Sequence, residues 1–181
     1  MGVWSRQEAM LALWPGDWLG QLHVAPAVIA LLIGPVIFLR RKGTGAHRAL
    51  GGAYVLCMIA VNGSALTMYD HSGGVNLFHV FAVVSLLTVV PGVIAILMGS
   101  VQGHYFFMCW SYFGLLAAGF SQVLPRLAPE AFLGWGLNAY SAAGIITGLS
   151  GGVAALLIAW QAKRLVPRYA GEAGEAGAVS A

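Results

Sequence analysis

The chain has 181 residues, of which 59% are hydrophobic and only 8% are charged, and its formal net charge is +3. Soluble domains carry about 25% charged residues, so this composition excludes a chain that covers itself with polar surface and indicates one dissolved in lipid. The positive charge lies in loops and in the tail, where it reports membrane topology and contact with anionic headgroups. We therefore exclude a nucleic-acid-binding protein.

Residues 1–20 combine three tryptophans with a few charged side chains, a mixture typical of a segment that lies in the membrane interface. Five apolar segments follow, and each is long enough to cross a bilayer. Proline is expected to bend the first segment at Gly34-Pro35 and to end the fourth at Pro125. Residues 166–181, rich in Gly, Ala and Glu, are expected to form a disordered tail. The predicted spans are 22–39, 47–69, 77–98, 104–124 and 137–160.

Lysine and arginine predict the orientation of these spans. Five spans put the two termini on opposite sides of the membrane, and most of the nine Lys and Arg residues then share one side, which is the cytoplasmic one. We therefore predict an all-α, polytopic protein of the inner (plasma) membrane: a five-helix transmembrane bundle over residues 21–165, N-terminus outside and C-terminus cytoplasmic. The cytoplasmic cations are Arg40, Arg41, Lys42, Arg48, Lys163, Arg164 and Arg168, and the outer ones are Arg6 and Arg126.

The fifth span carries Gly144, Gly148 and Gly152 at four-residue spacing, which lets a neighbouring backbone approach closely. Packing inside the bundle is the favoured interpretation. A homodimer interface and a groove for a flat cofactor are the alternatives.

Five histidines occupy two depths of the predicted bundle. His23 and His79 lie near the outer ends of the first and third spans, and His71 lies in the outer loop. His47 and His104 open the second and fourth spans on the inner side. Helices one and three therefore offer an outer imidazole pair, and helices two and four an inner pair.

Two imidazole pairs at two depths are the arrangement that stacked b-type haems require, since each low-spin iron takes two axial imidazoles. We therefore predict one or two haem b groups per chain, with Arg48 available to the inner propionates and Arg126 to the outer ones. Two other interpretations remain open. The outer histidines, His23, His71 and His79, have the chemistry to bind copper or zinc, or all five histidines serve only structural or interfacial roles.

Two motifs carry a family resemblance. His47-Arg48-x-x-Gly51-x-x-Tyr54 and His104-x-x-x-Met108-x-x-Ser111-Tyr112-x-Gly114-Leu115, followed by Arg126, resemble a bacterial family of small predicted membrane proteins of unknown function, over about residues 20 to 128. The family implies a helical bundle and no established activity.

The histidine arrangement is also distantly similar to the di-haem transmembrane cytochromes b of the ascorbate-reducing and hydrogenase-associated types. That likeness implies that His47 and His104 ligate an inner haem and that His23 and His79 ligate an outer one. His71 is an alternative to either outer ligand.

The predicted function is thus electron transfer by a small b-type-cytochrome-like protein or subunit, an oxidoreductase component if it is an enzyme, with a quinone as a possible partner. The first alternative is a non-redox accessory subunit of a larger membrane complex, which binds no cofactor. A weaker alternative is a metal-binding or transport protein that uses the outer histidines.

Overall fold

A computed structural model describes residues 17–68, 77–127, 144–150, 152–153, 156 and 159, except for the side chains of residue 77 and residues 125–127. Throughout this described part the regular structure is helical. Four helices are long and apolar enough to cross a membrane. They are α2 (Trp18–Leu39), α3 (Gly45–Thr67), α4 (Leu77–Leu97) and α5 (Val101–Leu127).

The fifth predicted span is helical over residues 144–150, but most of its other residues lie outside the described part of the chain. The count of five spans therefore stays a prediction. The predictions for residues 1–16, for His71 and for the tail over residues 166–181 also lie outside them.

The helix boundaries differ from the predicted ones by a few residues. Helix α2 begins four residues before the predicted start, because the Asp17 carboxylate accepts a hydrogen bond from the Gly20 N–H at 2.9 Å and caps the first turn. Helix α3 begins at Gly45, where the Thr44 hydroxyl accepts from the His47 N–H at 3.2 Å. The prediction that Pro125 ends the fourth span was wrong, since α5 continues to Leu127. Proline is tolerated in helices of this kind when the carbonyl it leaves unpaired finds another donor.

Helix α2 continues through Pro35, and the contact with α5 compensates for the missing proline N–H. The Leu31 carbonyl loses its normal donor four residues later, and the Tyr112 hydroxyl of α5 donates to it at 3.2 Å. The Tyr112 ring lies directly against Gly34, where any Cβ would overlap it. A glycine at position 34 therefore allows the tyrosine to pair the orphaned carbonyl.

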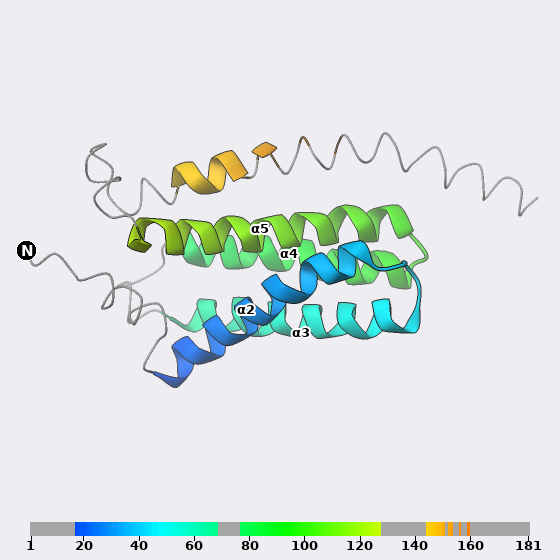
Figure 1. Cartoon of the computed structure of the whole chain (residues 1–181), viewed down its shortest axis with the longest axis horizontal. Coiled ribbons are helices and arrows are strands. Elements are labelled where there is room, and N and C mark those ends of the chain that lie inside the picture. The colour runs from blue at the N-terminus through cyan, green and yellow to red at the C-terminus, as the bar shows by residue number, and fades with distance from the viewer. Residues whose placement is uncertain are drawn as a thin grey trace, which may run out of the picture.

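The four helices form a bundle in which each packs on its sequence neighbours (Figure 1). Helix α2 crosses α3 at an incline and packs less closely on α5, whereas α4 and α5 lie side by side. The α2–α3 loop and the α4–α5 turn lie at the same end of the bundle. Helices α3 and α5 therefore start at that end, run in the same direction, and face each other diagonally.

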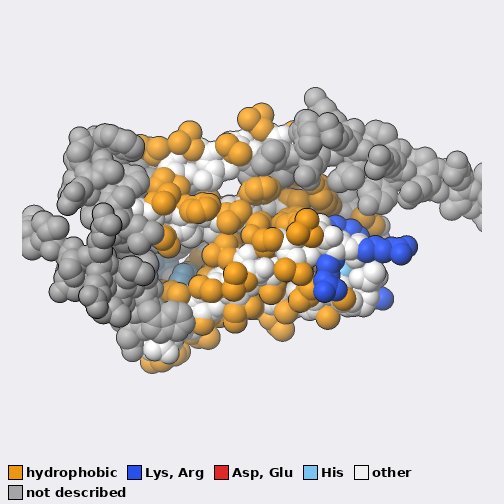
Figure 2. Space-filling model, in the orientation of Figure 1, with side chains coloured by type: hydrophobic (Ala, Val, Ile, Leu, Met, Phe, Trp, Pro, Cys, Tyr) orange, Lys and Arg blue, Asp and Glu red, His pale blue; other side chains and the backbone are white. Residues whose placement is uncertain are grey.

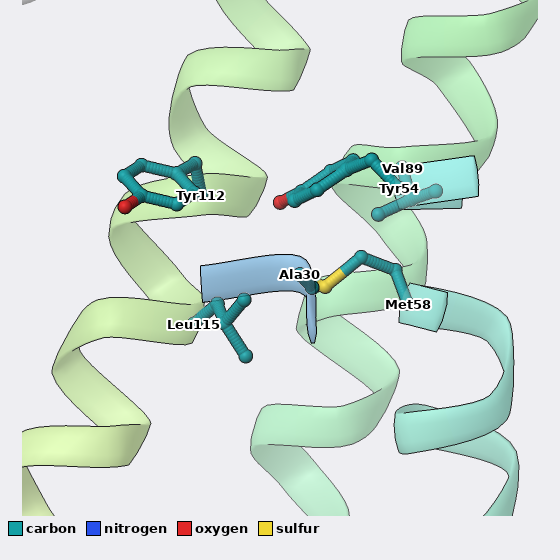
Figure 3. Packing of buried hydrophobic residues seen from close by; sticks show 6 residues of the cluster. All are labelled: Ala30, Tyr54, Met58, Val89, Tyr112 and Leu115. Atoms are coloured by element: carbon teal, nitrogen blue, oxygen red, sulfur yellow. The ribbon is translucent and has the colours of Figure 1, made fainter. Parts of the chain in front are cut away.

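The core is built from side chains of all four helices (Figure 3). Around it, large apolar side chains cover the sides of the bundle, as expected of a surface in contact with lipid (Figure 2). The central cluster consists of Ala30 from α2, Tyr54 and Met58 from α3, Val89 from α4, and Tyr112 and Leu115 from α5.

Candidate functional site

The two inner histidines lie at the end of the bundle that carries the α2–α3 loop, residues 40–44, and the α4–α5 turn, residues 98–100; we call it the basic end. His47 is in the first turn of α3 and His104 is in the first turn of α5. Both residues of the predicted inner pair therefore lie at this end of the bundle, each at the start of its helix.

A shared helical register puts both histidines at similar depth. Tyr54 follows His47 by seven residues and Ser111 follows His104 by seven residues, and the two hydroxyls are 3.0 Å apart in a hydrogen bond across the bundle. Seven residues make almost two turns, so each hydroxyl residue lies on the same helix face as its histidine. Since α3 and α5 run in the same direction, both histidines lie roughly 10 Å closer to the basic end than the hydroxyl pair, at similar depth.

The His104 ring is oriented by a neighbouring backbone. Its Nδ1 lies 2.9 Å from the Gly92 carbonyl of α4, and a carbonyl oxygen only accepts, so Nδ1 carries the hydrogen. In the neutral imidazole the lone pair is then on Nε2. Histidines that ligate metals in proteins are commonly held in this way, by a carbonyl on the other ring nitrogen.

The His47 ring has an unmet hydrogen-bonding requirement. Its Nδ1 is buried and has no hydrogen-bond partner among the described residues. A buried polar atom left unpaired costs roughly 1–3 kcal/mol, so this nitrogen is a position at which a ligand would be stabilising.

Lys42, in the α2–α3 loop, folds back onto the end of α2. Its ammonium donates to the Ile37 carbonyl at 2.8 Å and to the Phe38 carbonyl at 2.7 Å, which caps the last turn of α2. Its charge also interacts with His47 and with Cys109 of α5. Desolvation lowers the pKa of Lys42 from its ordinary value, an effect that its attraction to Cys109 partly offsets.

Arg48, the predicted propionate partner, is exposed in the first turn of α3. It belongs to a group of cations that gathers at the basic end (Figure 2). The group consists of Arg40, Arg41, Lys42 and Arg48. Arg126, the predicted outer counterpart, lies near the end of α5, and its side chain is outside the described part of the chain.

The opposite end of the bundle is arranged differently. His23 of α2 bonds to α3, with Nδ1 3.0 Å from the Val61 carbonyl and 3.2 Å from the Ser64 hydroxyl. His79 is buried on α4, with 5% of its surface exposed. The described hydrogen bonds of His23 are thus with α3. Its predicted partner, His79, lies on α4, which is diagonal to α2.

Polar side chains of α3 near this end bond to a neighbouring helix and to their own backbone. Asn62 donates to the Met58 carbonyl at 2.7 Å and to the Ser85 hydroxyl of α4 at 3.0 Å. Ser64 donates to the Ala60 carbonyl at 2.7 Å. These groups pair with each other and hold α2, α3 and α4 together.

Within the described ranges, no three His, Cys, Asp or Glu side chains converge as a metal site would require. These ranges offer a pair of imidazoles instead, and His71 lies outside them. The glycines of the fifth span, Gly144, Gly148 and Gly152, are exposed, and no described atom outside their own helix lies within 4 Å of where a Cβ would be. Their predicted packing role therefore stays a prediction.

Sequence reasoning found the histidines but missed the residues that set their geometry. Tyr54, Ser111 and the Gly92 carbonyl were not assigned to the site. A signal for the first two was present in the motifs, since both place a hydroxyl residue seven positions after the histidine. The Gly92 contact involves a backbone oxygen, which no residue type reveals.

Fold and site together define a multi-pass helical membrane protein with an imidazole pair at its basic end. Residues 20–160 match the model of the family described as "Predicted membrane protein (DUF2306)", and the chain belongs to this family. The resemblance to a family of small predicted membrane proteins is thereby confirmed. Comparison with curated proteins and with solved structures found no match, and the likeness to cytochromes b stays a prediction.

Proposed function

We propose that the protein is a membrane electron-transfer protein that binds a b-type haem between α3 and α5 at the basic end, with His47 and His104 as its axial ligands. The observation that carries this proposal is the common register of the two helices, in which the Tyr54–Ser111 hydrogen bond lies two turns beyond both histidines. When bound, the haem supplies a one-electron carrier, and the protein supplies its ligands, its surroundings and its charge balance.

The residues beyond the histidines fit a flat group. Gly51 lies one turn after His47, and no described atom outside its own helix lies within 4 Å of where its Cβ would be. A side chain at this position would occupy that space. The Tyr54–Ser111 bond closes the space toward the core, because both hydroxyls are fully engaged and buried.

Each ligand has a distinct supporting feature. The Gly92 carbonyl holds His104 with Nε2 free to bind iron. His47 has one buried ring nitrogen, Nδ1, without a hydrogen-bond partner in the described ranges. Arg48, exposed beside this pair, is placed to balance the carboxylates of the propionates.

A second haem between His23 and His79, with His71 as a possible replacement and Arg126 as propionate partner, stays our prediction for the opposite end. Val61, which bonds His23, follows His47 by fourteen residues, so the two levels are roughly 21 Å apart along α3. In this proposal the chain spans the inner membrane five times, with the basic end in the cytoplasm.

The test is a reduced-minus-oxidised difference spectrum of the purified full chain, produced with ample haem, together with a haem count per chain. A sharp α-band of the b type and one haem per chain support the basic-end site, and two haems support both sites. A colourless protein would overturn the proposal and leave the accessory subunit without cofactor as the better reading.

A further inference from the structure

The α2–α3 loop and the first turn of α3 concentrate positive charge, and no acidic residue of the described ranges lies at this end. In the described ranges, the side chains of Arg40, Arg41 and Arg48 are exposed, and the only acidic residue is Asp17, at the other end of α2. An uncompensated cluster of guanidinium groups repels itself unless an anion is bound. Arg48 is shared with the proposed haem site, whereas Arg40 and Arg41 are not, so the cluster as a whole calls for its own explanation.

The loop is held in one conformation by hydrogen bonds that involve Thr44. Its hydroxyl donates to the Arg41 carbonyl at 3.1 Å, and its own carbonyl accepts from the Arg48 N–H at 3.0 Å. Thr44 therefore links the backbone of Arg41 to that of Arg48. An ordered backbone at both arginines lowers the conformational entropy that is lost when they bind a common anion.

Lys42 does not belong to this pair, although it lies in the same loop. Its ammonium is directed back to the Ile37 and Phe38 carbonyls and lies 5.9 Å from the centre of the Phe38 ring. The cations left facing outward are thus arginines, which bind phosphate oxygens in a two-pronged geometry.

The position of the loop selects the anion. Helix α2 ends at Leu39 and α3 begins at Gly45, so the arginines lie where two apolar spans meet the membrane surface. The phosphates at that level belong to lipid headgroups. We infer that Arg41 and Arg48 form a binding site for the phosphate of an anionic phospholipid in the leaflet at the basic end.

The experiment uses the full chain in vesicles of phosphatidylglycerol and phosphatidylcholine in equal parts. After gentle extraction, the phospholipids that stay bound are counted by mass spectrometry. Phosphatidylglycerol should be retained in excess over phosphatidylcholine, and the double variant Arg41→Gln/Arg48→Gln should lower this excess by about tenfold. High salt should lower it as well, since the charges lie at the surface.

A matched control separates the site from general charge. Lys42→Gln removes one positive charge from the same loop as Arg41→Gln does, and it should reduce the retained lipid much less. Circular dichroism confirms that each variant keeps its helices.

Three outcomes would overturn the inference. They are equal retention of both lipids, equal losses in the Lys42 and Arg41 variants, and displacement of the lipid by inorganic phosphate at similar concentration, which would make a free anion the ligand. None of these readouts depends on haem.

Discussion

The two ends of the bundle each hold a histidine whose Nδ1 bonds a backbone carbonyl of an adjacent helix, Gly92 for His104 and Val61 for His23. At the basic end, His47 and His104 lie on diagonal helices that run in the same direction, and the Tyr54–Ser111 hydrogen bond joins these helices two turns further on. At the opposite end, His23 and His79 also lie on diagonal helices, and His79 is buried. The difference between the ends is the Tyr54–Ser111 bond, which we propose sets the register of His47 and His104.

The polar groups of α3 follow a different pattern at each end. Near the opposite end, Asn62 bonds Ser85 of α4, and Ser64 bonds its own backbone. At the basic end, the His47 Nδ1 is buried without a hydrogen-bond partner in the described ranges. An apolar layer that includes Met58 and Leu115 separates the two groups.

The largest test of this difference is to remove one histidine from each end. His104→Ala should abolish the haem spectrum of the basic end, because an axial ligand is lost and no other histidine lies within four residues of position 104. His23→Ala should leave that spectrum intact. The measurement is the α-band and the haem count of both purified variants.

If His104→Ala kept its full haem content while His23→Ala lost haem, the roles of the two ends would be reversed. Apoprotein folding is checked independently by circular dichroism, so that loss of haem is not confused with loss of the bundle.

A second test fills the space instead of removing the ligand. Gly51→Leu places a side chain one turn after His47, where a flat group would have to lie, and should lower haem content at least several-fold. Gly52→Leu is the control, since Gly52 is exposed and no described atom outside its own helix lies within 4 Å of its Cβ position either. Both variants should be as stable as the parent without haem. Equal haem content in the two would show that the space at Gly51 is not used.

Much of the helical framework could be predicted from hydropathy and charge. The predicted start of the third span at Leu77 is where α4 begins, and the first span ends at Leu39 as predicted. The observed start of α2 differs from the predicted one because Asp17 caps the helix. A single side-chain hydrogen bond there outweighs the weaker preferences of the neighbouring residues.

The site was predictable only in part. The depth of His47 and His104 follows from sequence position, since a helix fixes the rise per residue. Which helices are adjacent and which are diagonal depends on long-range packing, which the sequence pattern does not reveal. The hydrogen bonds of His23 to α3 were for this reason not predicted. The hydrogen bond from the Tyr112 hydroxyl to the Leu31 carbonyl could not be predicted for the same reason. Pro35 does indicate that this carbonyl lacks its usual donor.

A third test concerns the packing that brings α2 onto the basic half of the bundle. Gly34→Ala adds a Cβ that overlaps the Tyr112 ring, and it should lower the free energy of unfolding by about 1–3 kcal/mol. Gly114→Ala, with no described atom outside its own helix within 4 Å of its Cβ position, should be neutral or slightly stabilising. The measurement is unfolding in mixed micelles with increasing SDS. Equal stability of the two variants would contradict the close α2–α5 contact.

The smallest effect is expected from single hydrogen bonds, and it still distinguishes the two halves. Tyr54→Phe removes a side-chain hydrogen bond that joins α3 and α5 across the bundle, and it should cost about 0.6–1 kcal/mol in the same unfolding assay. Ser64→Ala should cost less, because His23 keeps its bond to the Val61 carbonyl. A double-mutant cycle with Ser111→Ala isolates the Tyr54–Ser111 term, since Ser111 also bonds the Met108 carbonyl at 2.9 Å. A coupling energy near zero would mean that the two hydroxyls do not hold the register, and that His47 and His104 owe their proximity to the surrounding apolar packing.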